Sequence, residues 1–245
     1  MIAARKSAGF DRIFRLYNDR YLLRRQFQSF AMSGHGLDVI PAGQPAIYIM
    51  NHSSWWDGLL LYHAFRQTSH ADHYVMMEER QLKRYAFFGK LGAFSIDKSS
   101  PGDIRQSMRY GGQLLQNGGR VWIFPQGEMK HLDTRPLGFR PGIHLLLRQA
   151  PVHTPVIPVT LYYGLFQHAR LQVSLHVGEP LREDWQNLRS AECSALLEER
   201  LTSQLNWHRD QMIRQDGNMA DERNLIPPRR STDDRYDQYR QWRKR

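Results

Sequence analysis

Hydrophobic and polar positions alternate along this chain in a way that predicts strands and helices in turn after about residue 45. Short apolar runs rich in β-branched and aromatic residues predict strands at 46–50, 73–77, 92–97, 120–124, 156–163 and 171–177. Helical spacing predicts helices at 57–65, 81–89, 103–117, 141–149 and 188–213. This repeated alternation predicts an α/β fold in which a mixed, largely parallel sheet is flanked by helices.

The segment before this region is basic and amphipathic. Residues 1–30 hold seven basic side chains and two acidic ones, a balance of +5. Apolar residues recur among them at roughly helical spacing: Phe10, Ile13, Phe14, Tyr17, Tyr21 and Phe27. Such a helix can lie in a membrane interface, with its arginines toward anionic headgroups. It can equally pack on its own domain with the arginines outward.

The composition changes again near the end of the chain. Beyond about residue 215 the sequence is rich in charge, with Pro227-Pro228-Arg229-Arg230 and a basic, aromatic end. We therefore expect a basic amphipathic membrane-interface helix in residues 1–35, a central domain in residues 36–214, and a charged, flexible, poorly ordered tail in residues 215–245. The tail can touch a membrane surface or RNA, but a solvated tail is the favoured interpretation.

Composition limits the classes of protein that fit. The chain has 245 residues, 41% of them hydrophobic, which is enough for one full-sized core. Its single cysteine, Cys193, excludes an intramolecular disulfide framework and favours a reducing compartment. No signal-peptide-like segment and no run of about 20 apolar residues is expected from the sequence. The net charge of +10 suits an anionic membrane surface. Nucleic-acid binding ranks lowest, because no nucleic-acid module accompanies the charge.

A histidine and an aspartate follow the first predicted strand. They stand five residues apart in Asn51-His52-Ser53-Ser54-Trp55-Trp56-Asp57. Histidine can take and return a proton near neutral pH, and a carboxylate on one ring nitrogen leaves the other free to act as a base. By itself such a pair is more often a surface hydrogen bond or a helix cap.

Three further segments end in polar residues after an apolar run. They are Gly92-Ala93-Phe94-Ser95-Ile96-Asp97-Lys98, Val121-Trp122-Ile123-Phe124-Pro125-Gln126-Gly127-Glu128, and Val156-Ile157-Pro158-Val159. The first places a cation beyond a strand end, and the second ends a buried strand in a turn where backbone N–H groups can meet a polar ligand. Each has a plain structural explanation when taken alone, as a turn or an edge strand.

In this order and at this spacing, the four segments resemble the glycerolipid acyltransferase family, typified by lysophosphatidic acid acyltransferases. The resemblance covers roughly residues 40–180. It implies that residues 36–214 form a glycerolipid-acyltransferase-like α/β domain. It also implies transfer of a fatty acyl group from acyl-CoA or acyl carrier protein to the hydroxyl of a lipid, without a metal or other cofactor, by a peripheral protein on the cytoplasmic face of the cell membrane.

The resemblance assigns roles to residues that match the family motifs. His52 corresponds to the general base and Asp57 to the carboxylate that orients it. Ser53 and Ser54 are expected as helix caps rather than nucleophiles. The expected acceptor-side contacts are Lys98, Gln126, Gly127, Glu128 and Arg140, the last in a Phe-Arg-Pro-Gly block that matches a later family motif.

Two departures from the family pattern leave the acceptor open. The third block usually reads Phe-Pro-Glu-Gly-Thr/Ser, and this chain has Gln126 and Glu128 instead. Lys98 stands where the family usually has an arginine. Arginine can donate two hydrogen bonds to one phosphate, whereas the lysine ammonium group acts as a point charge. A lysophosphatidate-like or other lysophospholipid acceptor is the first expectation. A lipid alcohol without a phosphate, such as a glycosylated lipid or carotenoid glycoside, is the alternative. A non-catalytic lipid-binding module on the same scaffold is the third.

Overall fold

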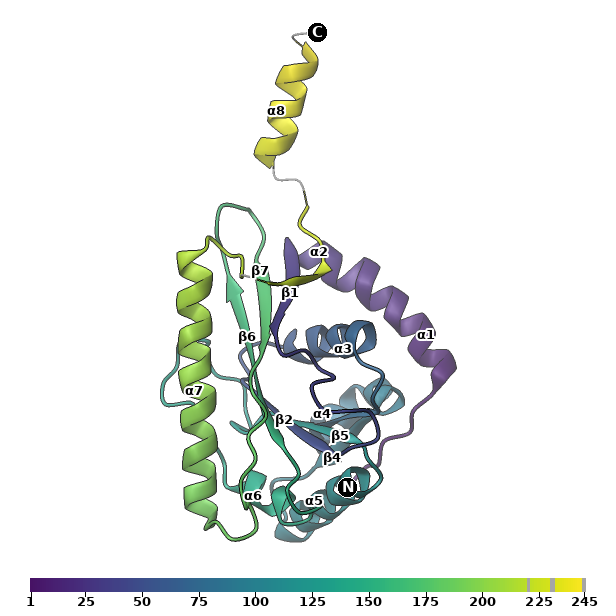
Figure 1. Cartoon of the computed structure of the whole chain (residues 1–245). Coiled ribbons are helices and arrows are strands. Elements are labelled where there is room, and N and C mark those ends of the chain that lie inside the picture. Colours follow the sequence, from purple (N-terminus) through teal and green to yellow (C-terminus); the bar gives the residue numbers. More distant parts are fainter. Residues whose placement is uncertain (220, 230–231, 244–245) are drawn as a thin grey trace.

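A computed structural model describes residues 1–219, 221–229 and 232–243. Within these residues, one sheet of eight strands has the order β4-β3-β5-β2-β6-β7-β1-β8 (Figure 1). Neighbours from β4 to β6 are parallel, β1 is parallel to β7, and β7 and β8 each have an antiparallel neighbour. The predicted mixed, largely parallel sheet is confirmed. The strands are β1 Ser29–Gly34, β2 Ala46–Met50, β3 His73–Glu78, β4 Ala93–Ile96, β5 Arg120–Ile123, β6 Val156–Gly164, β7 Gln172–Val177 and β8 Arg223–Ile226.

Helices cover both faces of the sheet, with α7 on one side and α1 and α3 on the other (Figure 1). The α-helices are α1 Ala8–Tyr17, α2 Arg24–Gln26, α3 Asp57–Thr68, α4 Glu79–Arg84, α5 Pro101–Gln116, α6 Gly142–Leu147, α7 Ser190–Arg214 and α8 Thr232–Arg243. A π-helical segment, Asn18–Leu23, joins α1 to α2, and a 3₁₀ segment, Ala86–Leu91, follows α4. Alternate side chains of β2 enter the two cores: Tyr48 and Met50 pack on the α3 side, and Ile47 and Ile49 on the side of α5–α7.

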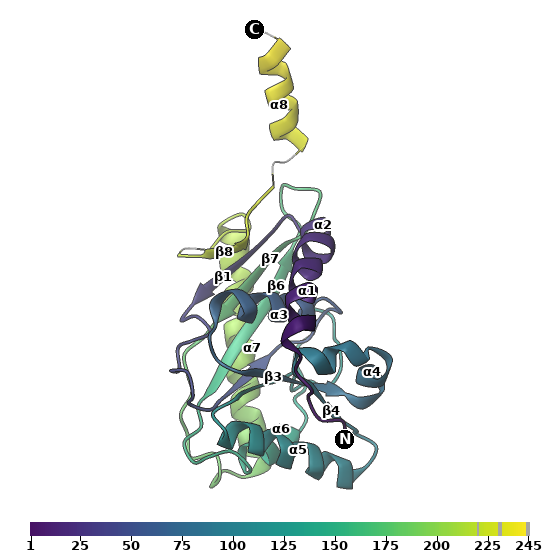
Figure 2. The ribbon, with the colours of Figure 1, turned by 90° about the vertical axis from the view of Figure 1, so that its right-hand side faces the viewer.

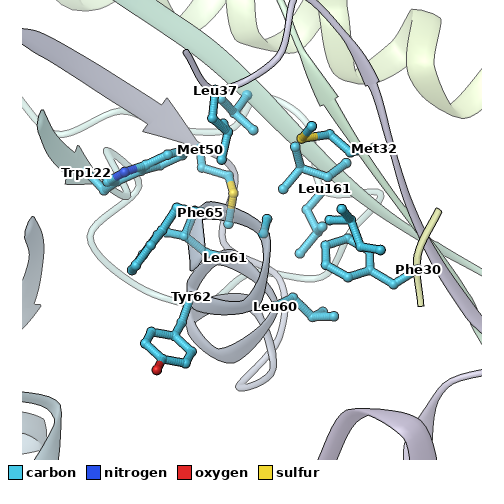
Figure 3. Close-up of a cluster of buried hydrophobic side chains, with 14 of the residues drawn as sticks. Phe30, Met32, Leu37, Met50, Leu60, Leu61, Tyr62, Phe65, Trp122 and Leu161 are labelled. Carbon is cyan, nitrogen blue, oxygen red and sulfur yellow. The ribbon is translucent and has the colours of Figure 1, made fainter. Parts of the chain in front are cut away.

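The packing of α3 holds the polar turn after β2 in place. Leu61 and Phe65 of this helix lie beside Met50 and Trp122 of the sheet (Figure 3). Fully burying one such side chain stabilises the fold by about 1.5–3 kcal/mol. The end of β2 and the first residue of α3, Asp57, are therefore fixed relative to each other.

The boundaries of the outer segments differ from those expected. A helix begins near residue 10 as predicted, but the range 1–35 also contains β1, a strand without a clear alternating pattern. Four residues assigned to the tail, Arg223–Ile226, pair with β1 as the edge strand β8. Beyond them, α8 extends away from the sheet (Figure 2). Across the described residues, no helix is both long enough and apolar enough to cross a bilayer.

The N-terminal helix combines the two interpretations that its pattern allowed. Phe14 is buried against the ring of Tyr62 in α3, at 5.3 Å between centroids. Ile13, Leu16 and Tyr17 share the other side of α1 and are 69%, 54% and 49% exposed. One side of the helix therefore packs on its own domain, and the other presents apolar side chains outward.

Candidate active site

Five parallel strands bring their carboxyl ends to the same edge of the sheet, where sites in α/β proteins commonly lie. The register between β2 and β5 pairs Ile49 with Ile123, so the residues three positions later, His52 and Gln126, also lie side by side. The backbone N–H of His52 donates to Oε1 of Gln126 at 2.6 Å. The sheet itself thus joins two of the sequence motifs.

The His52–Asp57 pair is formed. Nδ1 of His52 lies 2.7 Å from Oδ2 of Asp57. The same carboxylate oxygen accepts the backbone N–H groups of Ser53 at 2.7 Å and Ser54 at 2.9 Å. The carboxylate is fully buried at the first turn of α3, where the helix dipole favours a negative charge. A buried carboxylate with this many donors is held in one orientation and fixes the imidazole in turn.

Tyr163 supplies a further donor that the sequence motifs do not contain. Its hydroxyl donates to Oδ1 of Asp57 at 2.5 Å from the carboxyl end of β6. Desolvation, followed by the charge of Asp57, holds the pKa of Tyr163 well above its usual value of 10. The phenol therefore stays protonated at neutral pH and remains a donor. The sequence motifs do not point to it, because only the strand order shows that the end of β6 lies beside the end of β2.

The second ring nitrogen of His52 lies on the open side of the pair. No described residue hydrogen-bonds to Nε2, and the side chain is 23% exposed. The ring packs on Phe124, with 4.4 Å between centroids. With Nδ1 on the carboxylate, Nε2 is the atom that can accept a proton from a bound hydroxyl.

Asn51 fastens the start of this turn to the neighbouring strand. Its side-chain amide donates to the carbonyl of Leu161 at 2.9 Å, and its oxygen accepts the N–H of the same residue at 2.8 Å. Through these two bonds the side chain of Asn51 continues the contact between β2 and β6 beyond the last backbone pair, Met50 and Val159. The helix caps expected at Ser53 and Ser54 are not formed: the N-cap of α3 is Trp56, which has no side-chain cap, and the Ser54 hydroxyl instead accepts the N–H of Trp56 at 3.2 Å within the turn.

Lys98, Gly127 and Arg140 meet at the turn after β5. Lys98 donates to the carbonyl of Gly127 and lies 3.2 Å from the carboxylate of Glu78. Gly127 has φ +71°, and a Cβ there would lie 2.7 Å from Cδ of Arg140. The positive φ angle favours glycine at this position, and a larger residue would also require the side chain of Arg140 to shift. The N–H of Arg140 donates to the carbonyl of Pro125 at 2.9 Å, which holds the later motif on this turn.

The other two expected contacts have specific surroundings. Glu128 is exposed and lies 3.7 Å from Nη2 of Arg140. Gln126 is buried, and its amide oxygen is used by the backbone of His52. Gln126 thus supports the histidine, a role that differs from the acceptor contact expected from the sequence. An amide accepts this bond as a carboxylate would, without placing a charge in the interior. Among the described residues, no group of three or more His, Cys, Asp or Glu side chains is arranged to hold a metal ion.

Comparisons with known proteins agree with this sheet and this order of motifs. A family model described as Acyltransferase matches residues 32–162, more than half of the chain. The chain belongs to this acyltransferase family, which confirms the resemblance inferred from the motifs. It is 30% identical over 131 residues to 1-acyl-sn-glycerol-3-phosphate acyltransferase alpha of Ovis aries, covering 51% of this chain and 43% of that protein. The chain thus spans less than half the length of this curated relative.

A solved structure shares the fold. The crystal structure of the 1-acyl-sn-glycerophosphate (LPA) acyltransferase PlsC from Thermotoga maritima superposes with a TM-score of 0.58 at 16% identity. The match covers 81% of this chain and 79% of that one. At 16% sequence identity, this match shows a shared arrangement of the sheet and helices.

Proposed function

We propose that the chain is an O-acyltransferase that moves a fatty acyl group from acyl-CoA or acyl carrier protein to the hydroxyl of a lipid acceptor. One observation carries the proposal: His52 Nδ1 is held by Asp57 at 2.7 Å, while Nε2 stays on the open side of the site. Membership in the acyltransferase family supports the same reaction. The relatives' names refer to acyl transfer onto 1-acylglycerol phosphates, which are one class of lipid acceptor.

The proposed step needs one base and no covalent intermediate on the protein. Nε2 of His52 takes the proton from the acceptor hydroxyl while the hydroxyl oxygen attacks the thioester carbonyl. The carbon–sulfur bond breaks, an ester forms, and the thiolate leaves with the proton that His52 returns. Asp57 keeps the imidazole oriented and stabilises its transient positive charge. The acyl group passes directly from the donor sulfur to the acceptor oxygen, so no serine or cysteine of the chain is acylated.

We also propose that the protein works at a membrane surface, where its lipid acceptor resides. The outward side of α1 offers Ile13, Leu16 and Tyr17 to the acyl-chain boundary, and its exposed arginines suit anionic headgroups. The anionic lipids of the cytoplasmic leaflet attract such a basic helix, which favours that face of the membrane.

The direct test is transfer from a labelled acyl-CoA or acyl carrier protein to a panel of lipid alcohols by the purified full chain. His52→Ala is expected to lower kcat by about 10²- to 10⁴-fold while the chain stays folded, because it removes the general base and leaves Asp57 its other three donors. His70→Ala, at an exposed histidine after α3, is the matched control and should keep full activity. Full activity of His52→Ala would overturn the proposed mechanism.

A non-catalytic lipid-binding module is the second candidate, favoured by the altered third motif at Gln126. It makes a different prediction for the same proteins. Neither the unsubstituted chain nor His52→Ala would then show turnover with any acceptor, and both would bind lipid with equal affinity. Measured turnover by the unsubstituted chain that His52→Ala abolishes would exclude it.

A further inference from the structure

We propose that the acceptor side of this site is built for an uncharged, polyhydroxylated head group, the sugar of a glycosylated lipid, and that Glu78 sets this preference. The inference rests on the proposed acyl transfer and names the class of its acceptor. It follows from the charges that surround the Gly127 turn. The cations there, Lys98, Lys130 and Arg140, each lie within 4.0 Å of a carboxylate of the chain.

The cation expected to hold a phosphate already has a carboxylate beside it. Glu78 is the last residue of β3 and pairs in register with Ile96 at the end of β4, two residues before Lys98. This adjacency brings Glu78 Oε2 to 3.2 Å from Lys98 Nζ. The ammonium group also donates to the carbonyl of Gly127. Two acceptors of the chain thus engage Lys98 before any ligand does.

The second expected cation, Arg140, also has a carboxylate nearby, which it shares with Lys130. Nη2 of Arg140 lies 3.7 Å from Oε1 of Glu128, and Nζ of Lys130 lies 4.0 Å from the same oxygen. Glu128 is the acid that takes the place of a neutral Thr or Ser in the third family motif. The motif therefore carries its negative charge directly after Gly127, and Gln126 before the glycine is neutral.

A surface hollow of about 240 Å³ opens beside Lys98. It is lined by Glu78, Glu79, Arg80, Lys83, Ile96 and Asp97. Hydrogen bonds from Lys83 and Ser95 lower the pKa of Glu79 to about 2, so this acid is ionised at neutral pH. Three acids face two bases in the hollow, and the N-terminal amino group lies 3.3 Å from Glu79.

Phosphate and sugar head groups make opposite demands on such a surface. A phosphate monoester carries about −1.5 to −2 charges at pH 7 and has only acceptor oxygens apart from a residual proton, so it needs free cations. Here it would meet the carboxylates of Glu78 and Glu128 at close range. A sugar hydroxyl both donates and accepts, so it can bridge a carboxylate and an ammonium group without adding charge. Paired charges therefore select the sugar.

The test compares two soluble ligands with the same tail, hexyl glucoside and hexyl phosphate, by isothermal titration of the full chain. The unsubstituted protein is expected to bind the glucoside about tenfold more tightly than the phosphate, the size of one charge interaction near a protein surface. Glu78→Gln keeps an acceptor oxygen but removes the charge, and should bring the two affinities to parity by strengthening phosphate binding. Glu78→Ala should shift the ratio in the same direction. Glu199→Gln, which removes an exposed charge on α7, is the matched control and should leave the ratio unchanged.

Tighter binding of hexyl phosphate by the unsubstituted protein would overturn the inference, as would a ratio that neither Glu78 variant moves. The titration measures binding and does not depend on turnover, so the acyl-transfer proposal and the sugar preference can be refuted independently. A chain that prefers the glucoside and transfers no acyl group would refute acyl transfer alone. A chain that acylates lipids and prefers the phosphate would refute the sugar preference alone.

Discussion

The hydroxyl of Tyr163 donates to Asp57 at 2.5 Å, and this bond ties the carboxylate of the His–Asp pair to the strand next to the one that leads to His52. Asp57 itself begins α3, so strand β6, helix α3 and the turn after β2 all hold one carboxylate. The orientation of His52 therefore depends on the packing of the sheet as well as on the local motif.

Replacing Tyr163 with phenylalanine should lower kcat by about tenfold, because a hydrogen bond to a charged group is worth about 1.5–3 kcal/mol and three donors to Asp57 remain. KM for both substrates should change little, since Tyr163 acts through Asp57. Steady-state kinetics and the melting temperature of the variant measure the effect.

Tyr162→Phe is the matched control, because the neighbouring tyrosine points to the opposite face of β6, where its ring lies 6.1 Å from His208. It should keep the activity of the unsubstituted protein. An equal loss of kcat in both variants would mean that the hydroxyl of Tyr163 has no specific role.

Gln126→Leu should reduce activity at least as strongly as the loss of Tyr163, because it leaves the N–H of His52 without its acceptor. Leaving such a donor unsatisfied costs about 1–3 kcal/mol of folding stability, so a lower unfolding free energy should accompany the loss. Gln126→Glu keeps an oxygen in the same place and should retain most of the activity. Equal activity of the Leu and Glu variants would show that the hydrogen bond does not matter to the site.

The sequence alone predicts those strands and helices whose hydrophobic pattern lies within one short segment. The run 46–50 appears unchanged as β2, and the helix expected at 57–65 begins at Asp57 in the structure. The motif after β2 also placed His52 and Asp57 within reach of each other, because both lie in one short turn. These features are predictable because they depend only on residues that are close together in the sequence.

Contacts that depend on strand register were not predictable in this way. The sequence of Arg223–Ile226 is typical of a polar tail, and these residues form a strand because they pair with the edge strand β1. The hydrogen bond between Gln126 and His52 forms because β2 and β5 pair Ile49 with Ile123. Glu78 meets Lys98 for the same reason, across two paired strands. A sequence without the strand order cannot show which polar strand ends are neighbours.

The outward side of α1 should govern binding to membranes. Changing both Ile13 and Leu16 to glutamate removes two exposed apolar side chains, each worth about 1.5–3 kcal/mol when buried, and adds charges that anionic lipids repel. Co-sedimentation with phosphatidylglycerol-rich vesicles should fall at least about tenfold. Ile213→Glu, at an isoleucine of α7 that is 57% exposed, is the control and should sediment normally. Unchanged sedimentation of the double variant would place the membrane contact elsewhere.

A buried histidine should make the stability of the fold depend on pH. His208 of α7 lies 2.9 Å from both Thr160 Oγ1 and Ser174 Oγ, and desolvation, followed by the nearby His176, lowers its pKa to about 3. In the unfolded chain the same side chain takes up a proton near pH 6.5, so between these values the unfolded state binds more protons. Its contribution to stability is therefore complete above about pH 6.5 and is lost as the pH falls toward 3.

His208→Gln should flatten this dependence. Glutamine can still hydrogen-bond to its neighbours but does not titrate, so the free energy of unfolding should fall less steeply on acidification, by about 1.4 kcal/mol per pH unit between pH 6 and 4. Urea unfolding of both proteins at several pH values in this window measures the two slopes. His70→Gln changes an exposed histidine and should keep the slope of the unsubstituted protein. If His208→Gln also keeps that slope, the imidazole of His208 is not the group that couples protons to folding. The next to replace are then His73, whose pKa burial holds well below its usual value, and His176, whose pKa is lowered to about 4.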